Sequence, residues 1–284
     1  MLQVTFWGVR GSCPCANEEA QRYGGHTSCV EVRAGDEPAL ILDLGTGVRR
    51  LADDALASGR PIGPLHANVL LSHLHWDHIL GLPFCAPINL QGAEVDVFGP
   101  VQDGGTLHEA FDRFMQPPFF PVHVAELRGD VRFHDVWDED LAVGAVKVRV
   151  RPVPHKGPTI GFRIEWEGRS IAYVADHQAP GDLRSISPEV LEVCDGVDLL
   201  IHDAQYSEAE FAEKSDWGHS TVGYAVHVAR EAGARGLALF HHDPAHSDAD
   251  VDRLLDHARG LPEAQRIDWI LAAAEGQTLE WDAV

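Results

Sequence analysis

The sequence predicts a layered α/β domain in which sheets are covered by helices. Short apolar or alternating runs bounded by glycine-rich turns recur along the chain, as is typical of strands. Segments with apolar residues at helical spacing lie among these runs in both halves of the chain. The 284 residues contain no internal repeat and no long linker. One continuous domain spanning residues 1–284 is therefore expected, and this length suffices to bury a substantial core.

The first half of the chain is expected to form five strands and two helices. The first helix should end at Gly59, and the proline-rich segment 117–122 should end the second. The expected strands are 2–8, 29–35, 38–45, 67–72 and 94–100, and the expected helices are 48–59 and 106–116.

The second half of the chain shows different residue patterns from the first. Alternating or β-branched runs come first, with a hairpin-like turn at Glu167 and Gly168. The final third then combines strands with helical patterns, of which 219–233 is the clearest. The expected strands are 131–137, 145–154, 159–168, 169–176, 197–204 and 235–242.

The composition limits the classes of function. Apolar residues make up 45% of the chain and charged residues 23%, which is typical of a globular protein and excludes a disordered acidic tail. The chain has 22 Lys+Arg against 44 Asp+Glu, a net charge of −22, and this imbalance opposes sequence-independent binding to DNA or RNA, which depends on Lys and Arg neutralising phosphates. Seventeen residues are His, the usual metal ligand and near-neutral acid or base, so this surplus points to chemistry.

The sequence also predicts a compartment. The first residues contain no basic segment followed by an apolar one, so no signal peptide is expected. No run approaches the roughly 18 apolar residues that a membrane helix needs, so no membrane association is expected. The cysteines are odd in number and scattered, which favours reduced thiols and a cytoplasmic location. They are Cys13, Cys15, Cys29, Cys85 and Cys194, and the first two lack the second pair that a metal site would require.

One short segment carries four metal-capable side chains directly after the expected strand 67–72. They are His73, His75, Asp77 and His78. In an extended segment His73 and His75 point the same way, and Asp77 and His78 fall at the turn into a helix. The four can thus form two sets, which suits two ions about 3.5–4 Å apart whose shared water becomes hydroxide near neutral pH. The alternative is a surface run of His, and it is disfavoured because apolar segments lie on both sides.

The pattern H-x-H-x-D-H at 73–78 resembles the signature of the metallo-β-lactamase superfamily, and the resemblance extends over nearly the whole chain. It implies a four-layer αβ/βα sandwich with two mixed sheets flanked by helices. It also implies three further ligands, namely His155, a bridging Asp176 and His241, each directly after an expected strand. By this resemblance one ion would be held by His73, His75, His155 and Asp176, and the other by Asp77, His78, Asp176 and His241.

These donors are nitrogen and oxygen atoms, and none is a thiolate. Such a set favours two Zn²⁺ ions, with Mn²⁺, Fe and Ni²⁺ as open alternatives. His242 could exchange with His241 through a shift of register, but His241 is the first residue after the apolar run 237–240 and is preferred. His177, beside Asp176, could support a ligand, contact substrate or be exposed.

Two later segments resemble the phosphodiesterase branch of the superfamily, which includes ribonuclease Z. They are the strand 197–204 and the Gly-His-Ser-Thr stretch at 218–221. In that branch the His donates to the phosphate or the leaving oxygen, and an acid orients it. The matching residues here are His219 and Asp203, although ribonuclease Z typically has Glu at the second position. Ser220 and Thr221 could equally be an ordinary helix N-cap.

The N-terminal stretches 8–15 and 22–32 resemble bacterial cyclic-phosphodiesterase-like members of the branch. Such loops line the metal cleft, which makes Arg10, Ser12, His26 and Thr27 candidate substrate contacts. The glycines of these stretches could instead reflect turn geometry alone.

The expected function is a dinuclear metal hydrolase of small phosphodiesters, such as cyclic nucleotides or cyclic ribose phosphates. A metal-bridging hydroxide oriented by Asp77 would attack phosphorus, and His219, held by Asp203, would protonate the leaving oxygen. A tRNA 3′-processing role is disfavoured because residues 79–154 contain six basic residues among many acids and no basic arm.

Two other classes of function stay open. The same fold could hydrolyse thioesters, lactones or β-lactams, for which the segments around His219 and Asp203 are not needed. A degenerate metal-binding partner protein is the third class, and seven intact ligand candidates argue against it. Relatives in this branch often dimerise, so a homodimer is expected.

Overall fold

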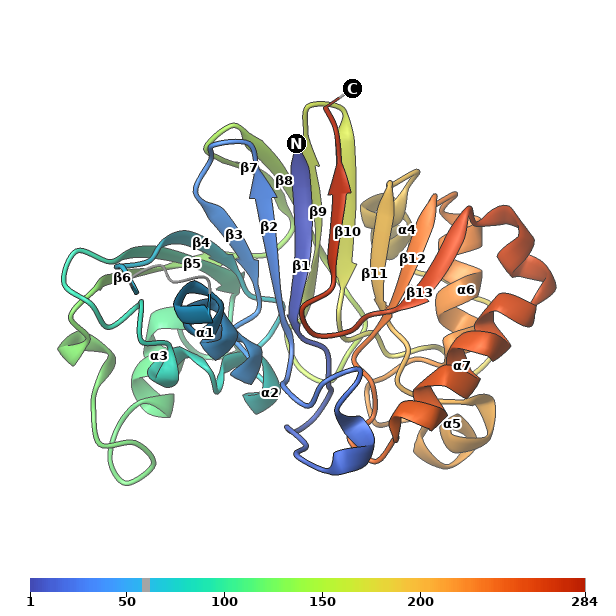
Figure 1. Cartoon of the computed structure of the whole chain (residues 1–284), viewed down its shortest axis with the longest axis horizontal. Helices are drawn as coiled ribbons and strands as arrows, with labels where there is room; N and C mark the ends of the chain where they lie inside the picture. Colours follow the sequence, from blue (N-terminus) through green and yellow to red (C-terminus); the bar gives the residue numbers. More distant parts are fainter. Residues whose placement is uncertain (58–61, 284) are drawn as a thin grey trace.

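The computed structural model describes residues 1–57 and 62–283, and these form two seven-stranded sheets packed face to face. Helices cover the outer faces of both sheets, as Figure 1 shows. The predicted four-layer sandwich with two mixed sheets is therefore confirmed. The expected end of the first helix at Gly59 lies outside the described residues.

The first sheet has the strand order β14-β1-β2-β3-β4-β5-β6. Strand β1 pairs antiparallel with β2 and β14, whereas β3 to β6 run parallel. The strands are β1 (Leu2–Gly8), β2 (Cys29–Ala34), β3 (Ala39–Leu42), β4 (His66–Leu70), β5 (Glu94–Pro100), β6 (Asp130–Val136) and β14 (Thr278–Trp281). The helices of this half are α1 (Arg50–Ala57), α2 (Trp76–Ile79) and α3 (Leu107–Phe114).

The second sheet has the order β13-β12-β11-β10-β9-β8-β7. Strands β7 to β10 are antiparallel neighbours, and β10 to β13 are parallel. The strands are β7 (Glu139–Val143), β8 (Val146–Pro152), β9 (Ile160–Trp166), β10 (Arg169–Val174), β11 (Leu199–Asp203), β12 (Gly236–Phe240) and β13 (Trp269–Ala272). The helices of this half are α4 (Pro188–Cys194), α5 (Glu208–Lys214), α6 (Val222–Glu231) and α7 (Asp248–Gly260).

Short 3₁₀ turns connect several of these elements. They are Glu18–Ala20, Thr46–Arg49, Leu82–Phe84, Val124–Glu126 and Pro262–Arg266.

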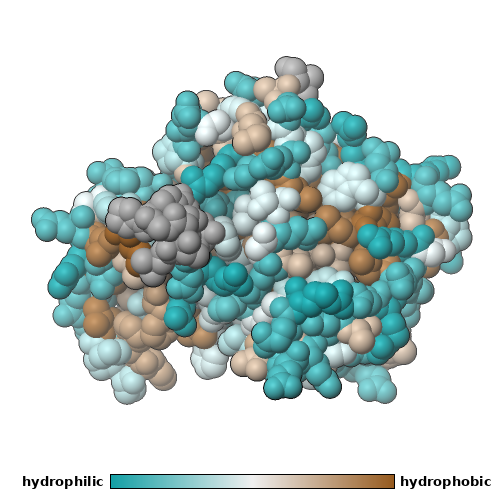
Figure 2. All heavy atoms as spheres, viewed as in Figure 1, coloured by the Kyte–Doolittle hydropathy of each residue, from teal (hydrophilic) through white to brown (hydrophobic). Residues whose placement is uncertain are grey.

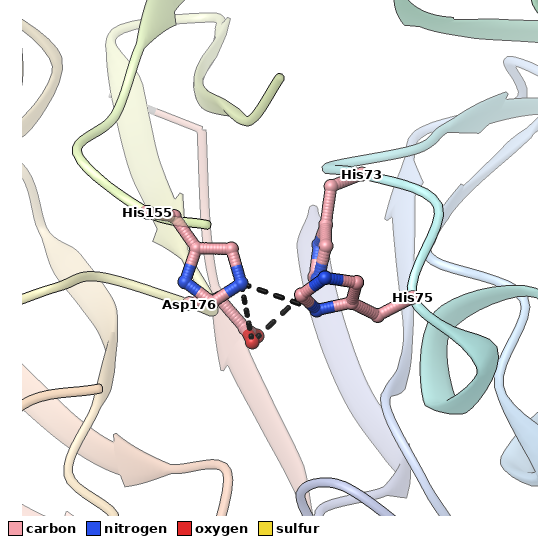
Figure 3. Close-up of side chains that lie close together, drawn as sticks. All are labelled: His73, His75, His155 and Asp176. Atoms are coloured by element: carbon pink, nitrogen blue, oxygen red, sulfur yellow. Dashed lines mark hydrogen bonds and ion pairs between the residues drawn. The ribbon is translucent and has the colours of Figure 1, made fainter. Parts of the chain in front are cut away.

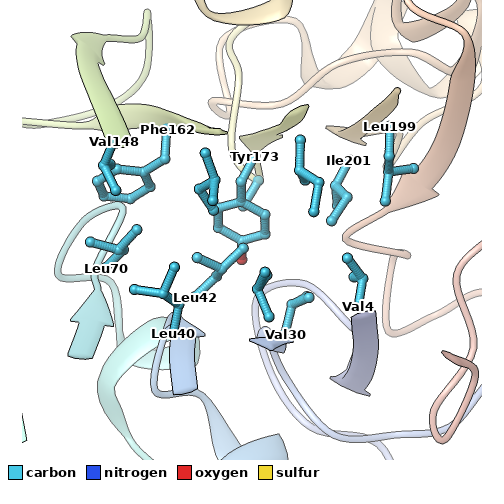
Figure 4. Close-up of a cluster of buried hydrophobic side chains, with 14 of the residues drawn as sticks. Val4, Val30, Leu40, Leu42, Leu70, Val148, Phe162, Tyr173, Leu199 and Ile201 are labelled. Atoms are coloured by element: carbon cyan, nitrogen blue, oxygen red, sulfur yellow. The ribbon is translucent and has the colours of Figure 1, made fainter. Parts of the chain in front are cut away.

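The core lies between the two sheets. Figure 4 shows hydrophobic side chains of β1 to β4 facing those of β8 to β11, among them the aromatic rings of Phe162 and Tyr173. Val4, Val30 and Leu42 lie on one side, and Phe162 and Ile201 on the other, all fully buried. Burial of this apolar surface is the main favourable contribution to folding, and it holds the two halves in register.

The strand ends that matter for function lie along one edge. The parallel strands β10, β11 and β12 end at Val174, Asp203 and Phe240, and β4 of the other sheet ends at Leu70. Polar residues follow each of these ends, and open α/β sheets bind ligands at such carboxyl ends. Among the described residues, no helix has the length and apolar character needed to cross a bilayer.

Candidate active site

Five of the seven candidate ligands lie in loops that follow strands of both sheets, and the other two lie in the short helix α2. His73 and His75 follow β4, Asp77 and His78 lie in α2, and the others follow β8, β10 and β12. Figure 3 shows His73 and His75 facing His155 and Asp176, which come from the opposite half of the molecule. The cluster therefore forms only when the two sheets pack together.

The first set of side chains is His73, His75, His155 and Asp176, which each offer one ligand atom within 4.8 Å of the others. His155 Nε2 lies 3.2 Å from His75 Nδ1 and 3.6 Å from Asp176 Oδ2. His73 Nε2 lies 3.7 Å from the same carboxylate oxygen. Two ring nitrogens of this set thus lie within 4 Å of Asp176 Oδ2, and His75 lies beside His155.

The second set is Asp77, His78 and His241. His241 Nε2 lies 3.0 Å from Asp77 Oδ2 and 3.3 Å from His78 Nε2. The other oxygen of Asp176, Oδ1, lies 3.0 Å from His78 Nε2 and 3.2 Å from His241 Nε2. Asp176 therefore presents one oxygen to each set.

Hydrogen bonds behind the imidazoles fix their orientation. His78 Nδ1 donates to Asp43 Oδ2 at 2.7 Å, His155 Nδ1 to the Gly218 carbonyl at 2.6 Å, and His241 Nδ1 to Gln205 Oε1 at 2.9 Å. Each bond leaves Nε2 as the nitrogen that faces the cluster, which is how metal-binding histidines are commonly held.

Asp43 is one of the supporting residues that the sequence analysis missed. Its carboxylate is fully buried and also accepts hydrogen bonds from Ser72 N, Ser72 Oγ and Tyr173 OH. Asp43 follows the apolar strand β3 directly, just as Asp176 follows β10 closely. The same signal, a carboxylate after a buried strand, could have identified it.

His219 and Asp203 form a pair at the edge of the cluster. His219 Nδ1 lies 3.0 Å from Asp203 Oδ2 and 3.7 Å from Asp176 Oδ2. Burial lowers the pKa of His219, but the carboxylates of Asp203, Asp176 and Asp77 together outweigh this effect and raise the pKa to about 9. Asp176, His219 and His241 also lie close enough to form a third candidate metal group.

A cavity of about 410 Å³ opens onto this cluster. It is lined by Ser12, Leu74, His75, Trp76, Asp77, Asp176 and His219. Ser12 also donates its backbone N–H to Asp77 Oδ2 at 2.8 Å. Ser12 is thus the one residue of the four N-terminal substrate candidates that reaches the cavity.

The interpretation of Arg10 and Thr27 as substrate contacts is wrong, because both are fully buried. The Arg10 guanidinium donates to the carbonyls of Gly24, Asp243 and His246, so it ties the N-terminal loop to the loop after β12. The Thr27 hydroxyl accepts from Thr46 N.

Three other histidines are placed away from the cavity. The His26 ring contacts Glu275. His177 and His202 are buried against each other, with His177 Nδ1 3.0 Å from His202 Nε2. The adjacent His241 and His242, directly after β12, point in different directions. His241 faces the cluster, whereas His242 Nε2 donates to the Ala273 carbonyl at 2.9 Å.

The fold can now be compared with known proteins. A family model described as Beta-lactamase superfamily domain matches residues 41–242. The chain belongs to this superfamily. As a member, it is a metal-dependent hydrolase.

One relative by sequence and two solved structures align with most of this chain. A Porphyromonas gingivalis protein named Ribonuclease Z is 28% identical over 276 residues, which span 78% of this chain and 84% of that protein. The crystal structure of a diphosphatase from the PhnP family has a TM-score of 0.70 and 20% identity, covering 100% and 99% of the two chains. Zn²⁺-bound PqqB from Methylobacterium extorquens has a TM-score of 0.71 and 17% identity, covering 98% and 100%. The two structures share the superfamily fold.

The superfamily fold implies divalent metal ions, and the residues present fit them. His73 Nε2 and Asp176 Oδ1 are buried without a hydrogen-bond partner among the described residues, although other polar atoms lie close to both. Burial lowers the pKa of His73 well below its usual range, so the ring is neutral, as a metal ligand must be. Burial likewise disfavours a charged His78, yet Asp77 and Asp176 raise its pKa well above normal. These carboxylates thus favour positive charge between them.

Proposed function

We propose that the protein hydrolyses small phosphodiesters, with cyclic nucleotides and cyclic ribose phosphates as the candidate substrates, and that it uses two divalent metal ions, preferably Zn²⁺. The observation that carries this proposal is the His219–Asp203 pair at the rim of the double cluster, in which His219 lines the cavity and the buried Asp203 holds its Nδ1. Hydrolysis of a carbonyl compound by a metal centre does not require such a pair.

The two sets of side chains would each hold one ion. One would use His73, His75, His155 and Asp176, and the other Asp77, His78, His241 and Asp176. When bound, the ions would polarise the phosphate oxygens and lower the pKa of a water molecule toward neutrality. All the donors are nitrogen or oxygen atoms, and such imidazole and carboxylate ligands suit Zn²⁺.

His219 is the proposed general acid. Its Nδ1 is held by Asp203, and Nε2 hydrogen-bonds to none of the described residues, so it is available to substrate in the cavity. The Asp203 carboxylate beside Nδ1 raises the pKa of His219 and so favours the protonated ring, which can give a proton to the leaving oxygen. Asp77, whose carboxylate accepts from Ser12 N, would orient the attacking water.

Charge favours a small substrate over a polynucleotide. The net charge of −22 repels a polyanion in general, whereas the bound ions would add four positive charges where one phosphate group sits. The cavity of about 410 Å³ is of the size that small ligands occupy.

Processing of tRNA 3′ ends is the second candidate function, because relatives at 26–28% identity are named Ribonuclease Z. It would require phosphate contacts that extend far beyond the cavity. A salt-dependent affinity for tRNA would support it, since each phosphate contact releases counterions.

The test is a substrate panel with the Zn²⁺-loaded protein. It contains bis(p-nitrophenyl) phosphate, 2′,3′- and 3′,5′-cyclic nucleotides, a cyclic ribose phosphate, a precursor tRNA, a thioester and a lactone. The expected result is turnover of the small phosphodiesters and a large loss of that turnover in His219→Ala. Turnover of only the thioester or the lactone would overturn the proposal, and cleavage of the precursor tRNA alone would establish the second candidate.

A further inference from the structure

A second, apolar cavity adjoins the active-site cavity. Leu74 and Trp76 line both, so the two cavities are neighbours on either side of these residues. The second cavity, of about 550 Å³, is lined by side chains of α2, α3 and the segment after α3, including Phe114 and Phe119. We call it the aromatic groove. A ligand whose phosphate occupies the first cavity therefore has to extend only past Leu74 and Trp76 to reach the groove.

The groove exposes an unusual amount of aromatic surface. Trp76 is 75% exposed and Phe119 is 81% exposed, and they line the same cavity. Figure 2 shows hydrophobic residues gathered at the lower left of the molecule, in the region where Figure 1 draws α3. Large apolar side chains gathered at one exposed site mark a binding surface more often than scattered ones do.

The polar groups of the groove indicate which hydrogen-bonding groups its ligand should carry. Arg113 brings a guanidinium, a planar group with donors only, and Gln102 brings a side-chain amide. The Gln102 amide nitrogen donates to the Pro100 carbonyl at 2.7 Å, so its oxygen remains as an acceptor. A planar ring whose edge carries both donors and acceptors matches this combination, and such a ring stacks on aromatic faces.

We infer that the aromatic groove binds the nucleobase of a nucleoside phosphodiester whose phosphate lies in the active-site cavity. The inference rests on the proposed function and sharpens it, because a cyclic ribose phosphate has no group to fill the groove. Stacking on Phe119 and Trp76 selects a ring without reading its identity, since every base has a π-face. Arg113 and Gln102 supply the contacts to the base edge. The groove thus makes nucleotides the preferred substrates over bare sugar phosphates.

The experiment compares two ligands that differ only in the base. Binding of AMP and of ribose 5-phosphate to the Zn²⁺-loaded protein is measured by isothermal titration calorimetry. The expected result is that AMP binds about tenfold more tightly or better, the usual gain from stacking one base. Phe119→Ala should remove most of this advantage, and Phe119→Tyr should retain it because the ring is kept.

Phe84→Ala provides the matched control. Phe84 is 54% exposed and packs against Phe120, but it does not line the groove. The AMP advantage should be unchanged in this variant. Equal affinities of the unsubstituted protein for AMP and ribose 5-phosphate would overturn the inference, as would an unchanged AMP advantage in Phe119→Ala.

Two further outcomes separate this inference from its alternatives. If a second copy of the chain covers the groove, Phe119→Ala will shift the oligomeric state in sedimentation, AMP will have no advantage, and the inference fails. Hydrolysis of phosphodiesters is measured in parallel. Base preference in binding without any hydrolysis would overturn the proposed function and leave the groove assignment intact, whereas hydrolysis without base preference would do the reverse.

Discussion

Replacement of Asp43 by asparagine tests how the second set of ligands is held. The Asp43 carboxylate accepts four hydrogen bonds in a fully buried environment. Oδ1 accepts from Ser72 N at 2.7 Å. Oδ2 accepts from Ser72 Oγ at 2.8 Å, Tyr173 OH at 2.7 Å and His78 Nδ1 at 2.7 Å. Burial and the nearby carboxylate raise the pKa of Tyr173 well above its usual range, so the phenol stays protonated and donates.

An amide cannot satisfy all four donors. If the amide oxygen in the Asp43→Asn variant takes the position of Oδ2, its NH₂ group faces the backbone N–H of Ser72, which can only donate. If the amide is turned round, NH₂ faces His78 Nδ1, and the ring must move its proton to Nε2. That nitrogen lies 3.0 Å from Asp176 Oδ1 and is the candidate ligand atom. Either orientation therefore costs the buried site one hydrogen bond or blocks the ligand.

The magnitudes follow from these two options. An unsatisfied buried donor costs about 1–3 kcal/mol in the free energy of unfolding. Loss of a hydrogen bond that orients a ligand lowers metal affinity or activity roughly 10–100-fold. Asp43→Asn should therefore bind Zn²⁺ more weakly and lower kcat/KM by the same range.

The assay is competition for Zn²⁺ against a chromogenic chelator, with kcat/KM for bis(p-nitrophenyl) phosphate measured beside it. Asp96→Asn is the control, because Asp96 also accepts from an imidazole, His134 Nε2 at 2.7 Å, but lies on the surface of β5. It should leave Zn²⁺ affinity unchanged. An Asp43→Asn variant with the Zn²⁺ affinity and kcat/KM of the unsubstituted protein would refute this account.

Three further predictions concern the acid, the metal and pH. His219→Ala should lower kcat by about 10²–10⁴-fold, the usual contribution of a general acid, with metal content by mass spectrometry unchanged; loss of metal would instead make His219 a ligand. Removal of metal by a chelator should abolish hydrolysis and lower Tm, because the ions stabilise only the folded state and their loss leaves the carboxylates of Asp77 and Asp176 close together without a cation. Addition of Zn²⁺ should reverse both effects. A Tm that does not change when the chelator is added would contradict this prediction. Burial lowers the pKa of His242 to about 3 in the folded state, against about 6.5 in the unfolded chain, so below pH 6.5 only the unfolded chain takes up this proton. Stability is then lost as pH falls, by about 1.4 kcal/mol per pH unit. Urea unfolding at pH 7 and pH 5 should show a smaller loss in His242→Gln than in the unsubstituted protein, and equal losses would count against this reasoning.

Much of the layout was predictable because it depends on local pattern. Alternation along β8 and β9 follows the period of a strand, so their buried faces could be identified without a structure. The segment 73–78 contains four metal-capable side chains within six residues, and Asp176 and His241 come within two residues of strand ends. Three strands escaped prediction. Strands β13 and β14 have only four residues each, and β7 begins with two exposed acids.

What only the tertiary structure decided is how distant groups pair. Strand β14 is defined by its pairing with β1 at the other end of the chain, where Trp281 lies opposite Leu2. Asp43 supports His78 from 35 residues away, and the Gly218 carbonyl orients His155 from 63 residues away. Arg10, expected at the substrate, is instead enclosed by backbone carbonyls from two distant loops.

The sequence by itself determined the α/β class, most of the strands and the kinds of side chain available for chemistry. The packing of the two sheets decided which nitrogen faces the cluster, which of His241 and His242 points inward, and that an aromatic groove adjoins the active-site cavity. The reason is physical. The periodicity of a helix or a strand depends on a few neighbouring residues and can therefore be recognised in the sequence, whereas a buried hydrogen bond forms only where folding brings its donor and acceptor together.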